Sequence, residues 1–91
     1  MSRYSVNTII NDVQLSVVLN LSADEAYAHA IRPEVLGNGW VSMLKVPALK
    51  EMAALKPEQF FCVAHTIDTG NPDDYNEQIL IVRQPDTNPV R

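Results

Sequence analysis

Cysteine is almost absent from this chain. Cys62 is the single cysteine among 91 residues, so no disulfide can form within the chain, whereas small secreted domains usually depend on several. No stretch approaches the roughly 18 apolar residues of a membrane-spanning helix, and the first residues alternate in polarity where a signal peptide would be continuously apolar. We therefore expect a soluble, cytoplasmic protein with no membrane partner.

Basic residues are also few. Seven Lys and Arg stand against eleven Asp and Glu, which gives a net charge of −4. Binding to DNA or RNA draws on clustered cations that displace counterions from phosphates, and here the basic residues are scattered along the chain. We expect no nucleic acid among the partners.

The sequence motifs typical of cofactor and metal sites are missing. The segment Gly37-Asn38-Gly39 is too short for a dinucleotide fingerprint, and no Lys-Ser or Lys-Thr pair follows it. The oxygen-rich segment 68–77 lacks the spacing of a calcium-binding loop, and turn formation explains its residues. We expect no cofactor and no metal.

Histidine offers little catalytic chemistry. His29 follows Glu25 by four residues, so the two side chains meet on a helix surface. Cys62 and His65 are three residues apart, which predicts opposite faces of a strand and excludes a thiolate–imidazole pair. We assign no catalytic residue, and a small enzyme that uses His65 is the last of the hypotheses considered below.

The clearest structural signal is an N-terminal β-hairpin over residues 4–21. Two alternating runs flank Asn11-Asp12, a pair that tolerates the positive φ angles of a type I′ turn. A tight turn pairs Ile10 with Val13 and predicts one apolar face along both strands. That face comprises Tyr4, Val6, Thr8, Ile10, Val13, Leu15, Val17 and Leu19.

Two helices are expected after the hairpin. Ser22 and Glu25 form a capping box that opens a helix over about 23–32, and its apolar stripe of small residues favours packing on the hairpin. Pro47 opens a second helix over about 47–56, which Pro57 ends.

Strands are expected near the C-terminus at about 60–67 and 77–83, and segment 40–46 reads equally as a short strand or an irregular connection. The unbroken apolar run 79–82 predicts burial on both faces, as in a central strand or one covered by a partner. The fold class is therefore α+β: residues 1–84 form a single domain with an antiparallel sheet covered on one face by two helices, and 85–91 form a flexible tail.

The sequence indicates less about function than about fold. The leading hypothesis is a non-enzymatic interaction module, a small acidic regulator, inhibitor or adaptor that binds another macromolecule and forms a homo-oligomer, with a dimer favoured. The alternative is a protein that binds or sequesters a nucleotide-like small molecule, with aromatic surfaces and arginines to hold it. Trp40 is either a core residue or an anchor for a partner. Candidate binding residues are Trp40, Asn38, Tyr27, Arg32, Tyr75 and Arg83.

Overall fold

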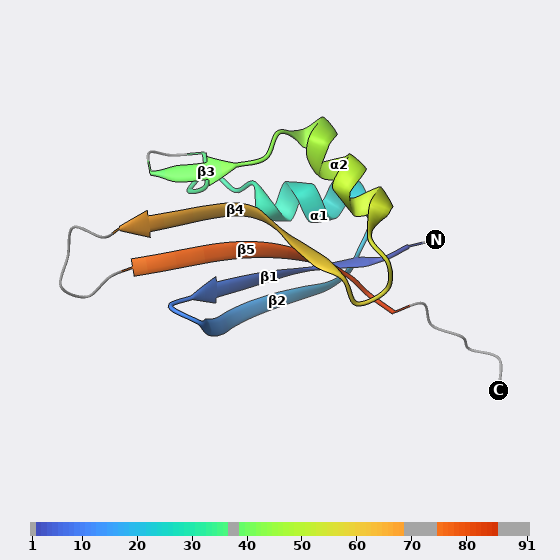
Figure 1. Cartoon of the computed structure of the whole chain (residues 1–91), viewed down its shortest axis with the longest axis horizontal. Helices are drawn as coiled ribbons and strands as arrows, with labels where there is room; N and C mark the ends of the chain where they lie inside the picture. The colour runs from blue at the N-terminus through green and yellow to red at the C-terminus, as the bar shows by residue number, and fades with distance from the viewer. Residues whose placement is uncertain (1, 37–38, 69–74, 86–91) are drawn as a thin grey trace.

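The computed structural model describes residues 2–36, 39–68 and 75–85, and these form a five-stranded antiparallel sheet with two helices. The elements follow the chain in this order: β1 (Tyr4–Ile10), β2 (Val13–Leu21), α1 (Ala23–Ala30), β3 (Trp40–Ser42), α2 (Lys45–Ala54), β4 (Phe60–Asp68) and β5 (Tyr75–Arg83). The strand order is β2-β1-β5-β4-β3, and both helices lie on the same side of the sheet (Figure 1). The expected fold class is confirmed.

The turn between β1 and β2 has the predicted chemistry. Asn11 and Asp12 have φ angles of 49° and 67°, and Ile10 pairs with Val13 directly across the turn. The Asn11 side-chain oxygen accepts a hydrogen bond of 2.8 Å from the Asn76 main-chain N–H, so the tip of the hairpin is also tied to β5.

Beyond the turn, the predicted register of the hairpin is wrong because β2 carries two bulges. Leu15 is the extra residue between the pairs Ile9–Gln14 and Thr8–Ser16, and a second irregularity lies near Asn20, whose φ angle is 65°. Each extra residue shifts the pairing and reverses which side chains face the helices. Leu15, Val17 and Leu19 are consequently exposed instead of forming the floor for α1, and Leu21 is the only buried residue of β2.

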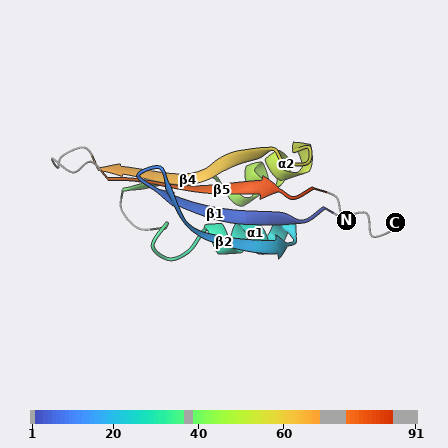
Figure 2. The same ribbon diagram turned by 90° about the horizontal axis from the view of Figure 1, so that it is seen from below.

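The C-terminal strand β5 is the centre of the sheet, between β1 and β4. Ile79 and Ile81 are fully buried on the helix side, whereas Leu80 and Val82 on the other side are only half-buried. The unbroken apolar run therefore does mark a central strand, but neither of the two described helices lies over its second face. Seen from below, both helices lie behind the strands (Figure 2).

Helix α1 begins at the predicted capping box and ends slightly earlier than expected, at Ala30. The Ser22 hydroxyl accepts from the Glu25 main-chain N–H at 3.2 Å, and the Glu25 carboxylate accepts from the Ser22 N–H at 2.9 Å. Ala26 and Ala30 are fully buried, because small side chains let the helix axis approach the sheet closely.

Helix α2 begins two residues before the predicted start. Leu44 is its N-cap, so Pro47 lies at the third helical position, where a missing N–H costs nothing because the first four N–H groups of a helix have no partner inside it. Ala48, Met52 and Leu55 are buried, while Ala53 is exposed.

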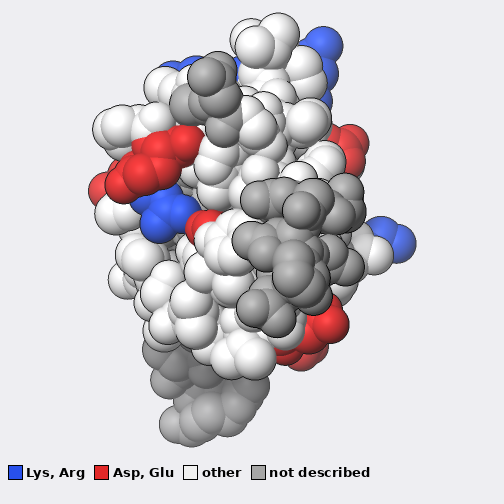
Figure 3. All heavy atoms as spheres, turned by 90° about the vertical axis from the view of Figure 1, so that its left-hand side faces the viewer, with Lys and Arg blue, Asp and Glu red and all other residues white. Residues whose placement is uncertain are grey.

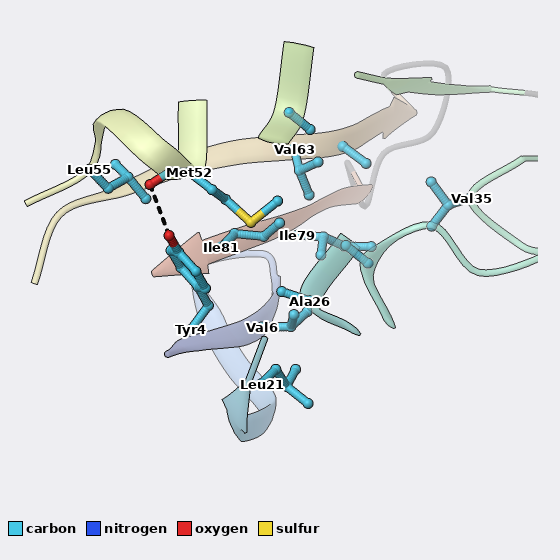
Figure 4. Packing of buried hydrophobic residues seen from close by; sticks show 13 residues of the cluster. Tyr4, Val6, Leu21, Ala26, Val35, Met52, Leu55, Val63, Ile79 and Ile81 are labelled. Carbon is cyan, nitrogen blue, oxygen red and sulfur yellow. Dashed lines mark hydrogen bonds between the residues drawn. The ribbon is translucent and has the colours of Figure 1, made fainter. Parts of the chain in front are cut away.

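The core fills the space between the helices and the sheet (Figure 4). Met52 projects from α2 over Ile81, and Ala26 lies on α1 above Val6. Segment 40–46, which had two interpretations, contains the short strand β3 and then the first residues of α2. The proposed flexible tail falls almost wholly on 86–91, outside the described residues. No helix within the described ranges is long and apolar enough to cross a membrane.

Candidate functional site

A polar cluster lies at the end of the sheet near the hairpin tip, on the helix side. The Tyr75 hydroxyl donates to one carboxylate oxygen of Glu77, and Arg32 Nη2 lies 3.7 Å from the other. The side chain of Glu77 is only 13% exposed and that of Arg32 is 39% exposed. Arg32 thus meets two residues of β5 that are distant from it in the chain, and Arg32 and Tyr75 are predicted site residues.

Trp40 belongs to the same end of the sheet. It pairs with Thr66 across β3 and β4, and Thr66 pairs in turn with Glu77, so the three side chains share one row on the helix side. The Thr66 hydroxyl donates to the Gly39 carbonyl at 2.5 Å, which fixes the approach to β3. Trp40 is half-buried and packs against the core, in line with its interpretation as a core residue.

The other predicted site residues are not brought to this cluster. Tyr27 uses its hydroxyl to donate to the Met43 carbonyl at 2.9 Å, so it joins α1 to the segment before α2. Arg83 lies six residues beyond Glu77 on β5, roughly 20 Å away, and its Nη1 donates to the Leu55 carbonyl at 2.7 Å. Asn38 falls outside the described residues.

The chemistry of this cluster is that of a structural contact. The pKa of Tyr75 is raised, first because its hydroxyl donates to Glu77 and further because the neighbouring carboxylate opposes a second negative charge. A proton held in this way is not released near neutral pH. The ion pair between Arg32 and Glu77 ties the segment just after α1 to the central strand.

The prediction that Cys62 and His65 face opposite sides of the sheet is wrong. A bulge at Val63 inserts one extra residue in β4, so Cys62 pairs with Leu80 and His65 with Gln78, on the same face. The pair is still not activated. Burial raises the pKa of the Cys62 thiol, and its Sγ donates to the Ala64 carbonyl at 3.2 Å. The neutral thiol is not the reactive form.

His29 is exposed on α1, four residues after Glu25. Across the part of the chain that the structure describes, no group of three or more His, Cys, Asp and Glu side chains has the arrangement of a metal site. Figure 3 views the end of the molecule at the left of Figure 1, and there the described charged side chains of both signs lie scattered among uncharged ones.

The most unusual surface is the side of the sheet opposite the helices, called the open face here. Cross-strand pairing assigns to it fourteen residues from all five strands: Ser5, Asn7, Ile9, Gln14, Val17, Val41, Phe60, Cys62, His65, Ile67, Asn76, Gln78, Leu80 and Val82. None of them is Asp, Glu, Lys or Arg, although the chain has eighteen such residues. Glu77 and Arg83 are adjacent along β5 to residues of this face, but their pairing with Ile10 and Tyr4 places them on the helix side.

Several apolar side chains of the open face are in contact with water. Phe60 is 60% exposed, Val41 62% and Ile67 56%, and they are joined by the half-buried Leu80 and Val82 of the central strand. Along the strands of an antiparallel sheet, apolar residues on the packed side normally alternate with polar residues on the solvated side. An uncharged, half-apolar face of this extent is typical of a surface that contacts another molecule.

The sheet edges are less suited to contact. The outer edge β2 bears no charged residue but is interrupted by its two bulges, and the outer edge β3 has only three residues. Bulges and short edge strands both prevent regular pairing with another strand. The broad surface of the sheet is therefore the better candidate.

Sequence reasoning missed the open face as a site. The one local sign of this face in the sequence is the unbroken apolar run Ile79–Val82, which predicts burial on both sides of the strand. The rest depends on the strand order and on bulges, which no local pattern gives. Comparison with known proteins produced no match to a family model, to a curated protein or to a solved structure.

Proposed function

We propose that this protein is a non-enzymatic interaction module, a small regulator, inhibitor or adaptor that binds another protein through the open face. The observation that supports this most directly is the absence of charged residues among the fourteen side chains of the open face, all of which except the buried Ser5 are partly or fully exposed. Burial of exposed apolar area contributes roughly 25 cal/mol per Å². A partner that covers this surface would therefore bind with a large favourable contribution from the apolar area removed from water.

The absence of charge on this face also bears on the class of partner. A phosphate backbone or an anionic lipid surface would require Lys or Arg at the contact, and the open face has neither. The cores of protein–protein interfaces are depleted of charged residues in the same way. A protein partner therefore suits this surface better than a nucleic acid or a membrane.

Affinity capture with matched variants tests the proposal. Phe60→Glu/Ile67→Glu places two carboxylates at opposite ends of β4 on the open face, and Leu44→Glu/Val46→Glu makes the same change in charge at exposed apolar positions at the start of α2. Immobilised wild-type protein and the helix control should retain the same partner from host extracts, and the open-face variant should lose it. Retention of the same proteins by all three would contradict the proposal.

A nucleotide-like ligand is the second candidate. It is favoured by Arg32, whose Nε is buried without a hydrogen-bond partner among the described residues, and which meets Glu77 in the row that contains Trp40. Titration of Trp40 fluorescence with a panel of nucleotides tests it, because Trp40 is the single tryptophan. A shift that Arg32→Met abolishes would support this function, and no shift with any compound would count against it.

A further inference from the structure

We infer that the occupant of the open face is a second copy of this chain, stacked face to face so that two five-stranded sheets form the inside of a dimer and the helices lie outside. This inference rests on the proposed function and names the partner. It is carried by three properties of the face: the absence of charge, the kind of polar group it bears, and its size.

The charge pattern suits self-association. In a two-fold symmetric contact each patch meets its own copy, so a charged residue near the axis faces an identical charge. A chain of net charge −4 can approach its copy only through a surface on which this repulsion is small. The open face carries none of the chain's Asp, Glu, Lys or Arg residues, and the helices on the other side carry several.

The polar residues of the face are self-complementary as well. Asn7, Gln14, Asn76 and Gln78 have amide side chains, each of which both donates and accepts. An amide can therefore pair with its own symmetry mate, which neither a carboxylate nor an ammonium group can do. Within the chain, Asn7 Nδ2 donates to Ser5 Oγ at 3.1 Å.

The size of the face matches what a stable dimer needs. The four long strands have seven to nine residues each. At about 4.8 Å between strands and about 3.3 Å per residue, they cover a flat footprint of roughly 500–600 Å². Accessible area follows the relief of the side chains and exceeds this footprint, which brings it near the ~800 Å² that each partner of a standard interface buries.

The way in which two sheets pack points to stacking rather than edge pairing. Sheets stack about 10 Å apart with interleaved apolar side chains, and the open face offers Ile9, Leu80 and Val82 on its inner strands β1 and β5 for such contacts. Pairing through β2 would instead require a regular edge, which its two bulges interrupt.

Cys62 supplies a direct probe, because it is exposed on the open face and is the only thiol in the chain. We would measure the mass of the full-length protein by sedimentation equilibrium from micromolar to millimolar concentration, together with the rate of Cys62 alkylation by iodoacetamide. Stacking predicts that the mass doubles and that alkylation slows at least fivefold over the same concentration range.

The matched variants make the test specific. Phe60→Glu/Ile67→Glu should remain monomeric with a concentration-independent alkylation rate, and Leu44→Glu/Val46→Glu should dimerise like the wild type. A wild-type monomer at every concentration, or a dimer in which Cys62 stays fully reactive, would overturn the inference. The proposed function would survive a monomer if the captured partner were a different protein that the open-face variant fails to bind.

Discussion

The Tyr4 hydroxyl donates a hydrogen bond of 3.1 Å to the main-chain carbonyl of Met52, and this contact joins the first strand to the last turn of the second helix (Figure 4). Arg83, which pairs with Tyr4 across β1 and β5, reaches the Leu55 carbonyl at the end of the same helix. The last carbonyls of a helix have no partner within it. The Leu55 main-chain N–H donates to the Met52 carbonyl at 3.1 Å, and the sheet supplies the two further donors at this helix end.

Removal of the Tyr4 hydroxyl tests this contact. Tyr4→Phe keeps the buried ring and deletes one hydrogen bond, so we expect a loss of about 1 kcal/mol in the free energy of unfolding. For a domain of this size that lowers Tm by about 4–8 °C. Tyr75→Phe, at an exposed position, is the control and should change Tm much less. Equal effects of the two substitutions would argue against a stabilising role for the Tyr4–Met52 bond.

Met52 itself carries the largest packing contribution that we expect on α2. It is 1% exposed and is among the largest fully buried side chains. Met52→Ala removes three heavy atoms from a site enclosed by both helices and the sheet, and should cost about 2–5 kcal/mol in urea unfolding. Glu51→Ala, on the exposed side of the same helix, should stay within about 0.5 kcal/mol of the wild type. A cost below 1 kcal/mol for Met52→Ala would mean that the core under α2 is loosely packed.

The turn, the capping box and the order of the elements are predictable from short stretches of sequence. The turn at Asn11-Asp12 and the cap at Ser22 each depend on a few adjacent residues, so they are visible in the sequence. The bulges are different, because an extra residue in a strand is chosen by the pairing with its neighbour and by the twist of the whole sheet. The adjacent pair Val17-Val18, which breaks the alternation of β2, is the one local sign of the shift.

The difference between local and long-range contacts also explains which parts of the candidate site could be predicted. Side-chain chemistry alone points to Arg32 and Tyr75, and both contact Glu77, a long-range arrangement for Arg32 that its sequence position does not show. The open face could not be read in advance, because its residues come from five strands whose order is set by long-range pairing. Burial of Ile79 and Ile81 was foreseeable from the apolar run alone.

The hairpin turn offers a test of backbone strain. Asp12 has a φ angle of 67°, in the left-handed region where a β-branched residue is strained by about 1–2 kcal/mol and glycine is not. Asp12→Val should lower the free energy of unfolding by about that amount, whereas Asp12→Gly should leave it unchanged or slightly higher. Urea unfolding of both variants measures the difference. If valine and glycine gave the same stability, the type I′ geometry of the turn would be wrong.

The capping box of α1 makes stability depend on pH in a predictable direction. The pKa of Glu25 lies below its ordinary value of 4.5, chiefly because its carboxylate accepts the Ser22 main-chain N–H and also because of the hydrogen bond with the Ser22 side chain. A carboxyl group whose pKa is lower in the folded state stabilises the fold at pH values above the unfolded pKa, and this contribution disappears as the pH falls through the folded pKa. Stability should therefore decline as the pH falls below the ordinary glutamate pKa of 4.5, partly through this group.

Two substitutions isolate that effect. Ser22→Ala should cost about 1 kcal/mol at pH 7, because both hydrogen bonds of the cap depend on the ordered N-cap, and the gap from the wild type should narrow in acid as Glu25 is protonated. Glu25→Gln removes the titrating group, so its unfolding free energy should fall less steeply with acid than that of the wild type. Glu51→Gln, an exposed change on α2, controls for the general loss of a negative charge. A gap between Ser22→Ala and the wild type that stays constant from pH 7 to pH 3 would show that the cap acts without the Glu25 charge.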